Sequence, residues 1–431
     1  MTRAPDRAAT PVRANPPFRG WWIVAVGLMA QAITIGLTII PFGFFTTPLV
    51  EEFGASIAEV AIGLGIFTIA MTGVGGLIGR LLDNGSIRAV MACGSLVMAA
   101  SFYAMSLATE LWQLAALFGL GVASGVTMAG PLPATTVIAK WFDRKRGFAV
   151  GIASTGPLVG GALLTPLVGW LLDTTGWRET LQVFAGISIL IAPLALIVVR
   201  NTPEDIGQRV DGSTDETATQ AGASSGRELS AREILHSRNF WALALAIGIV
   251  FGLGTGWSAN VPRFGEDLGH AAPRMSILIG VASAPGAIAT LIFGGLADRV
   301  GNRALLWACI SGQGSALLIL ATAPADALFA VGIVLFGFAG GGLLPVYAAY
   351  IGRLFGAASF GSVMGLAGLV MLPFGATAPV LAGAVRDATG SYVAALFGFS
   401  LAFAASCALL TLIRPSHTQP SAYAAGGKEV A

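Results

Sequence analysis

The sequence predicts an all-α polytopic membrane protein in which twelve transmembrane helices form two related six-helix bundles. Three observations support this prediction. First, 55% of the 431 residues are hydrophobic and only 11% are charged, whereas a soluble domain carries about 25% charged residues. Second, twelve apolar segments follow one another, each near the roughly 20 residues that a helix needs to cross a bilayer. Third, the two halves of the chain repeat.

The repeat is carried by small, acidic and proline residues. A short charged turn rich in glycine, residues 79–88, returns as residues 294–303. At the offset that places Gly147 on Gly361, Asp173 falls on Asp387 and Pro131 falls on Pro345. Two parallel halves related by an axis along the membrane normal place a substrate site between them, near the midplane.

The elements follow from the apolar runs. In the first half we expect helices at about 20–45, 58–79, 88–107, 112–139, 147–171 and 179–199. In the second half we expect them at about 240–260, 275–296, 303–322, 327–351, 361–384 and 392–413. The predicted regions are therefore a tail (1–19), an N-terminal bundle (20–200), a linker (201–238), a C-terminal bundle (239–413) and a second tail (414–431). The linker is polar and of low complexity, which predicts a flexible connection.

The positive charges predict the orientation. Of the 24 Lys and Arg residues, all but Arg178, Arg263, Arg274 and Arg386 lie in the tails, the linker and alternate loops on one side. Positively charged loops stay in the cytoplasm, so both termini and the linker are expected there, with the protein in the inner cell membrane. The first apolar run is long enough to span, so it is not a cleavable signal.

The two charged turns supply candidate gating residues. These are Gly79, Asp83, Gly85 and Arg88 in the first turn, and Gly295, Asp298, Arg299, Gly301 and Arg303 in the second. An Asp at a helix end can accept from the free N–H groups that begin a neighbouring helix, and Arg can bridge to carboxylates or carbonyls. Contacts made in only one conformation bias an equilibrium. The alternative is a loop whose Arg residues only set topology; the fixed glycine spacing favours gating.

Uncharged polar residues are the candidates for lining a cavity between the bundles. They are Gln31, Thr34, Thr127, Ser154, Thr155, Trp257, Asn260, Ser283, Tyr347 and Tyr350. For each alone, hydrogen bonding within its own helix, or an interfacial position for Trp and Tyr, is an equal alternative. Two interpretations also remain for the Gly156-Pro157 step in the fifth helix. It could expose backbone groups to a ligand, or it could permit close packing of the helices. Close packing is preferred.

Charged residues are missing from the depth of all twelve expected spans. A proton relay inside the membrane normally retains such a residue, so we expect no dedicated side-chain proton shuttle, and any coupled proton would travel on the substrate. No nucleophile–base pair, metal-ligand cluster or cofactor motif is present, and the three His residues lie outside the spans. The sequence thus argues against an enzyme, a metal site, a cofactor and nucleic-acid binding.

At this point the chain resembles the major facilitator superfamily over essentially its whole length. The second charged turn is similar to the superfamily signature Gly-x-Leu-x-Asp-Arg-x-Gly-x-Arg at every position. The first has Asn84 in place of Arg and is one residue short. Phe142, Arg146 and the following glycines, with Phe240-Trp241, resemble the monocarboxylate and oxalate/formate branch. The resemblance implies the major facilitator fold, rocker-switch alternating access and a cavity lined by helices 1, 4, 5, 7, 8 and 10.

The substrate is less well specified than the fold. The monocarboxylate branch often holds a carboxylate with an Arg in its eighth helix, but residues 276–290 carry no charge here. The fifth helix partly matches a motif of drug–proton exchangers. We therefore predict a monomeric secondary transporter of a small organic solute in the lipid bilayer, with a monocarboxylate as the first candidate. One alternative is a proton-coupled drug or metabolite exporter. Another is a receptor that has lost transport, which is disfavoured because the linker and tails are too short and polar to hold an output domain.

Overall fold

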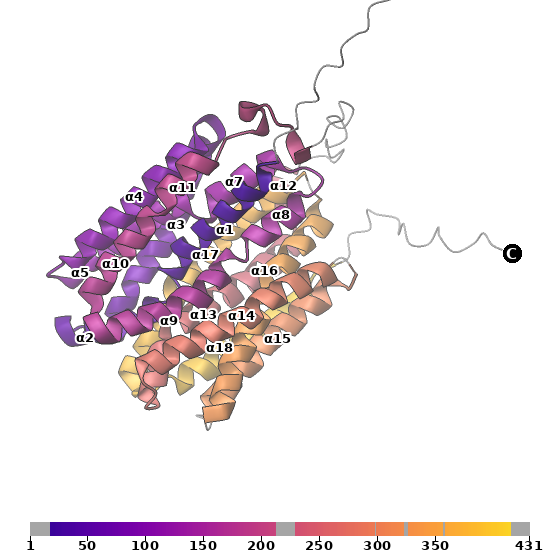
Figure 1. Cartoon of the computed structure of the whole chain (residues 1–431). Coiled ribbons are helices and arrows are strands. Elements are labelled where there is room, and N and C mark those ends of the chain that lie inside the picture. The colour runs from indigo at the N-terminus through magenta and orange to yellow at the C-terminus, as the bar shows by residue number, and fades with distance from the viewer. Residues whose placement is uncertain (1–17, 213–228, 298, 323–325, 357, 415–431) are drawn as a thin grey trace, which may run out of the picture.

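The computed structural model describes residues 18–212, 229–297, 299–322, 326–356 and 358–414. Within them, eleven helical stretches are long and apolar enough to cross a membrane. The first crossing is the exception, because its regular part, Gly20–Gly36, is shorter than a span. The N-terminal helices form one half of the molecule and the C-terminal helices the other (Figure 1).

Several crossings of the N-terminal bundle consist of more than one helical segment. The six crossings are α1 (Gly20–Gly36), η1 (Phe42–Phe45) and α2 (Thr46–Phe53); α3 (Ile57–Asn84); α4 (Ile87–Ser106); α5 (Leu111–Ala116), η2 (Leu117–Val122), α6 (Ala123–Ala129) and α7 (Pro131–Trp141); α8 (Arg146–Ala153) and α9 (Gly156–Thr175); and α10 (Trp177–Ile189) and α11 (Ile191–Val198). The short elements η3 (Pro203–Ile206), η4 (Val210–Gly212) and α12 (Ala231–His236) belong to the connection between the bundles.

The C-terminal bundle has unbroken crossings. They are α13 (Arg238–Asp267), α14 (Ala272–Leu296), α15 (Asn302–Ala321), α16 (Asp326–Phe355), α17 (Phe360–Thr389) and α18 (Val393–Thr411). Two of them, α13 and α17, run furthest past the ends expected from the sequence. Their last turns carry charges that pair with one another, Arg263 with Glu266 at 3.3 Å and Arg386 with Asp267 at 2.7 Å. Such pairing lets a helix continue where charge alone suggested a loop.

Local sequence explains where several crossings start and break. Ser56 and Glu59 form a capping box at the start of α3, which satisfies two of the N–H groups that a helix start leaves free. The fourth crossing breaks at Gly130, because Pro131 supplies no N–H to continue the ladder. Its segment η2 is a π-helical turn, a feature that also bends a helix.

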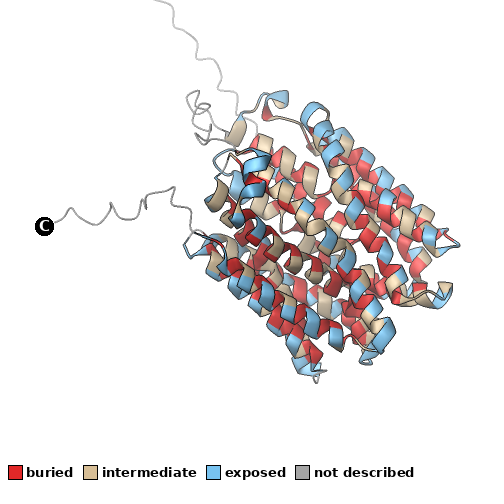
Figure 2. Cartoon of the chain, turned by 180° about the vertical axis from the view of Figure 1, so that it is seen from behind, coloured by how far each residue is buried: buried red, intermediate tan, exposed pale blue. Residues whose placement is uncertain are grey.

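Each bundle has its own hydrophobic core. One cluster of buried side chains is drawn from residues 23–199, and a second from residues 234–413. Each cluster takes one member from the other bundle: Ala259 belongs to the first and Phe44 to the second. Buried residues lie on the inner sides of the helices and exposed ones on the periphery (Figure 2).

The helix ends define two faces of the molecule, which we call the linker face and the opposite face. The linker face carries the turns at 85–86, 142–145 and 299–301, together with the segment 199–212. The opposite face carries the turns at 54–56, 107–110, 268–271 and 390–392. Each crossing runs from one face to the other.

Candidate functional site

The bundles touch at the half of the interface nearer the opposite face. The short segment η1 of the first crossing packs there against α13. A Cβ placed on Gly43 would overlap the carbonyl oxygen of Ala259 and would lie 2.7 Å from the Pro262 ring. The neighbouring Phe44 is 3% exposed and sits in the core of the C-terminal bundle. Such close contact between backbones seals this side of the interface.

Polar contacts join the bundles beside this seal. Thr47 of α2 donates to the Glu266 carboxylate and accepts from Arg263 Nη1 at 2.9 Å. Asp387, in the last turn of α17, accepts from two backbone N–H groups at the start of α3, those of Ile57 at 3.4 Å and Ala58 at 3.0 Å. These contacts link α2 to α13 and α3 to α17 at the opposite face.

Toward the linker face the same helices separate. A Cβ on Gly65 of α3 would lie 2.7 Å from the carbonyl oxygen of Ala376 in α17, but none on Gly73 or Gly76 would meet an atom within 4 Å. The glycines of α17 nearer the linker face, Gly361, Gly365 and Gly368, also face open space. The fifth crossing (α8 and α9) and α14 repeat the pattern: Gly161 of α9 lies close to Ser283, but Gly147 and Gly151 of α8 and Gly295 of α14 are open. The interface therefore opens on the linker face.

The polar candidates of the N-terminal bundle gather where the first crossing meets the breaks in the fourth and fifth. Gln31 packs beside Gly156, just after the break that contains Ser154 and Thr155, and Thr34 packs against Gly130. The hydroxyls of Thr34 and Thr155 donate to carbonyls of their own helices, at 2.7 Å each. Gln31 differs from them, because its side chain is 2% exposed and its Nε2 has no hydrogen-bond partner.

Thr127 and Ser283 behave like the other hydroxyl residues. Thr127 donates to Ala123 O at 2.7 Å, and Ser283 donates to Ile279 O at 3.1 Å, each within its own helix. Ser283 nevertheless faces the N-terminal bundle, since its Oγ would lie 2.7 Å from a Cβ on Gly161. Ser283 therefore lies at the interface, but its hydroxyl proton is already donated to Ile279 O.

The remaining candidates belong to the C-terminal bundle. Trp257 and Tyr347 are 1% and 2% exposed members of its hydrophobic core, and neither the indole N–H nor the phenol has a partner. Asn260 is fully engaged, donating to Gly256 O and Pro379 O and accepting from Tyr392 Oη at 3.0 Å. Tyr350 is only half-buried.

The charged turns are built alike at the linker face. In the first, Lys140 at the end of α7 donates to Leu82 O at 3.2 Å, in the last turn of α3. In the second, Arg353 at the end of α16 donates to Ala297 O at 2.8 Å, just after α14. Cations near the carboxyl end of a helix stabilise it. The sequence did not lead us to predict that Lys140 and Arg353 each bind the end of a neighbouring helix, although their separation is close to the repeat offset.

The candidate gating residues lie at these turns. Asp83 and Arg88 are exposed at the ends of α3 and α4, and Gly79 faces open space. Gly85 ends α3, and its carbonyl accepts from Asn201 Nδ2 at 2.9 Å. In the second turn Gly301 precedes α15, Gly295 faces open space, Arg299 is exposed and Arg303 lies 5.0 Å from the Trp307 ring. Asp298 lies outside the described residues.

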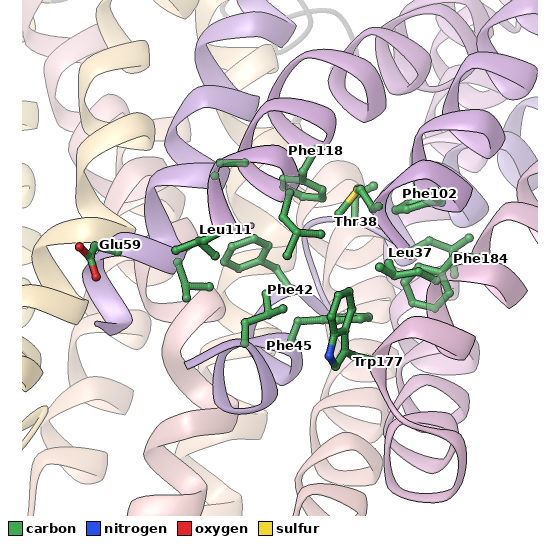
Figure 3. Close-up of a pocket in the computed structure, with 17 residues that line it drawn as sticks. Leu37, Thr38, Phe42, Phe45, Glu59, Phe102, Leu111, Phe118, Trp177 and Phe184 are labelled. Carbon is green, nitrogen blue, oxygen red and sulfur yellow. The ribbon is translucent and has the colours of Figure 1, made fainter. Parts of the chain in front are cut away.

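A separate apolar pocket lies inside the N-terminal bundle beside the break in the first crossing (Figure 3). It encloses about 590 Å³ including its mouth, and rings of Phe42, Phe118, Trp177 and Phe184 line it. Glu59 lies at its edge, away from these rings (Figure 3). The carboxylate of Glu59 accepts from the Ser56 N–H at 2.7 Å as part of the capping box. The pocket therefore offers no free polar group and is not a site for a polar solute.

Charge is excluded from the buried interior. Apart from the aromatic residues, every buried polar residue in the described chain is a Gln, Thr, Ser or Asn. Within the same residues, no group of three His, Cys, Asp or Glu is placed to hold a metal ion. The buried interior of the described chain is thus without charge, and the charged groups that join the bundles, Arg263, Glu266 and Asp387, lie at the closed opposite face.

Comparison with known proteins identifies this architecture. The model of the Major Facilitator Superfamily matches residues 24–294 and 258–430, which together take in almost the whole chain. The chain belongs to the Major Facilitator Superfamily. The resemblance and the fold class predicted from the sequence are therefore confirmed, and the protein is a multi-pass membrane transporter rather than an enzyme.

Individual relatives are distant but extensive. Monocarboxylate transporter 13 of Rattus norvegicus is 26% identical over 411 residues, covering 93% of this chain and 91% of that protein. The MFS-type transporter pynF of Aspergillus niger is 25% identical, covering 78% and 74%. The uncharacterised MFS-type transporter YcxA of Bacillus subtilis is 23% identical, covering 89% and 92%.

A solved structure shows the same fold. A bacterial homologue of the human lysosomal transporter Spinster, in an inward-facing and unoccupied conformation, matches with a TM-score of 0.69 at 19% identity. The match covers 93% of this chain and 96% of that one. At this identity the likeness concerns the fold alone.

Proposed function

We propose that this transporter moves a small monocarboxylic acid across the inner cell membrane by alternating access. The observation that carries the proposal is an interface between two bundles that touch near one face and part toward the other, with no charged residue in the buried interior of the described chain. Similarity to monocarboxylate transporters supports the substrate class.

The conformation follows from the distribution of charge. The linker face carries most of the Lys and Arg residues, and positively charged loops remain in the cytoplasm. The termini and the linker are then cytoplasmic, and the open interface faces inward. Residues 20–200 and 239–413 act as the two rigid bodies of a monomer, joined by the linker at 201–238.

The uncharged interior favours the neutral form of the substrate. Burying an isolated carboxylate without a cation is very costly, and no basic side chain is buried in the described residues. A protonated acid carries its own proton and needs only hydrogen-bonding partners. The coupled proton then travels on the substrate, and no carboxylate relay in the protein is required.

Gln31 is the side chain best suited to bind that acid. Its Nε2 is buried without a partner, and an unsatisfied buried donor costs about 1–3 kcal/mol. A substrate carbonyl that accepts from Nε2 removes this cost. Ser154, at the adjacent break in the fifth crossing, is the neighbouring candidate.

Transport assays test the substrate class. Proteoliposomes with labelled lactate or pyruvate should show uptake that increases as the external pH falls, because the neutral fraction of the acid grows. Efflux of a hydrophobic dye, with no carboxylate uptake, would instead favour the drug or metabolite exporter. The partial drug-exchanger motif in the fifth helix is the feature that keeps that second candidate open.

A matched pair of variants tests the role of Gln31. Gln31→Leu should lower kcat/KM for the acid about tenfold, the equivalent of one hydrogen bond worth roughly 1.4 kcal/mol. Gln313→Leu is the control, because Gln313 is also buried with an unpaired side-chain atom but lies in α15, away from the interface. Equal losses in both variants would show a general packing defect and contradict the assignment.

A further inference from the structure

The start of α3 is completed by a residue from the other bundle. Of its first free N–H groups, that of Glu59 is accepted by Ser56 Oγ at 3.1 Å. Those of Ile57 and Ala58 are accepted by the two carboxylate oxygens of Asp387. An α-helix leaves its first N–H groups without intrahelical partners, so Asp387 serves as a second cap for α3 across the bundle interface.

The charge of Asp387 suits this position. The N-terminus of a helix carries a partial positive charge, and a carboxylate beside it is stabilising. The end of α17 that carries Asp387 is tied to the end of α13, because Arg386 binds Asp267 through two hydrogen bonds of 2.7 and 2.9 Å. Arg263 also approaches Asp267, at 3.7 Å. The basic groups nearby are thus engaged with other partners.

The contact exists only while the opposite face is closed. Ile57 and Ala58 belong to the N-terminal bundle and Asp387 to the C-terminal bundle, so separating the bundles at this face must break both hydrogen bonds. The α3 start would keep its own Ser56–Glu59 box but would leave two N–H groups to water.

The repeat supplies an internal comparison. Asp173 stands at the position of the N-terminal half that corresponds to Asp387. The helix that it could cap, α14, starts with Ala272-Pro273 and has no side-chain cap, and Pro273 removes one of the N–H donors. The pair α3–α17 is therefore latched at the opposite face, whereas the pair α9–α14 is packed there without a latch.

We propose that Asp387 is the gating residue of the opposite face, stabilising the closed state by capping α3 across the interface. This role rests on the alternating access proposed above but is independent of the substrate. Losing the carboxylate should shift the resting equilibrium toward opening of that face by about threefold to tenfold. A ligand or substitution shifts such an equilibrium only through contacts that differ between the states. The contact between Asp387 and the start of α3 differs between them, because it joins the two bundles.

A distance measurement across the opposite face tests the proposal without any substrate. Spin labels at Glu110→Cys and Thr322→Cys, which are exposed residues of the N- and C-terminal bundles at that face, report its opening in the cysteine-free, full-length protein in nanodiscs. Asp387→Asn should increase the population at longer distance by the same threefold to tenfold. Asp387→Ala should do so even if the Asn amide oxygen still caps α3. Asp173→Asn should leave the distribution unchanged.

A third variant separates gating from helix stability. Ser56→Ala weakens the same helix start from within its own bundle, so it should lower the melting temperature without moving the distance distribution. The proposal is overturned if Asp387→Ala leaves the distribution as in the parent, or if Asp173→Asn or Ser56→Ala shifts it equally. Failed carboxylate uptake with a shifted distribution would refute the substrate and leave the latch intact.

Discussion

Asn260 shows how a polar residue can resemble a binding residue in sequence and yet hold the fold together. Its amide donates to Gly256 O at 2.8 Å and Pro379 O at 3.3 Å, and its oxygen accepts from Tyr392 Oη. Two helices, α13 and α17, and the residue that precedes α18 therefore meet at one side chain. Within a membrane, interhelical hydrogen bonds contribute about 0.6 kcal/mol on average.

Replacing Asn260 should consequently damage stability before it affects substrate binding. Asn260→Leu is expected to cost about 1–3 kcal/mol, because the buried hydroxyl of Tyr392 loses its partner, and to leave KM for the acid unchanged. Tyr392→Phe removes only one bond and should cost less. Thermal unfolding of the purified variants, together with their transport kinetics, provides the check. A KM increase without destabilisation would place Asn260 in the binding site after all.

Residue roles of this kind were only partly predictable from sequence. The types of the polar residues could be read directly, but which of them keep a free donor depends on helix rotation and on partners far along the chain. Thr34 and Thr155 use their hydroxyls within their own helices, whereas Gln31 does not. Asp387 was recognised only as a position of the repeat, because its partners are backbone N–H groups that carry no sequence signal.

At the scale of single helices, apolar length predicted the crossings well and their breaks poorly. The first crossing was expected as one helix over 20–45, but α1 ends at Gly36 and the chain resumes as η1 at Phe42. Proline and glycine mark such places without fixing whether a helix bends or stops. The equivalent helix of the second half, α13, is unbroken even though it contains Pro262.

Close packing explains the glycines of the fifth crossing. A Cβ on Gly160 would overlap Ala32 O of α1, and one on Gly156 would lie 2.5 Å from Leu28 O. Small residues allow helix backbones in membranes to approach this closely. The Gly-Pro step thus serves the packing of α9 against α1, as the preferred interpretation of the sequence had it.

Gly160→Val should therefore destabilise the protein, by about 1–3 kcal/mol for an overpacked contact, because Ala32 O is backbone and cannot move aside. Gly151→Val is the matched control, since a Cβ on Gly151, in the same crossing, meets nothing within 4 Å. Melting temperatures in detergent measure both. Equal melting temperatures for the two variants would contradict the packing role of Gly160.

At the scale of the whole molecule, the two bundles are related by sequence repeat but not joined symmetrically. The segment η1 of the N-terminal bundle packs against the C-terminal bundle, and its Phe44 lies in the C-terminal hydrophobic core. Asp387 latches only one of the two helix pairs. The repeat predicted where the interface lies, while the state in which it rests depends on these unpaired contacts, which no repeat encodes.

Crosslinking along one helix pair tests whether the resting interface is closed at one end only. A Cβ on Gly375 would lie 3.2 Å from Thr68 Cγ2, so Thr68→Cys with Gly375→Cys brings two thiols within reach of a disulfide. Oxidation of this pair in a cysteine-free background should trap the closed face and stop uptake until reduction.

Gly73→Cys with Gly368→Cys, on the same helices but in open space, should resist crosslinking in the resting protein. Equal crosslinking of both pairs would contradict the open linker face, and undiminished uptake by the oxidised first pair would contradict rocking of the bundles.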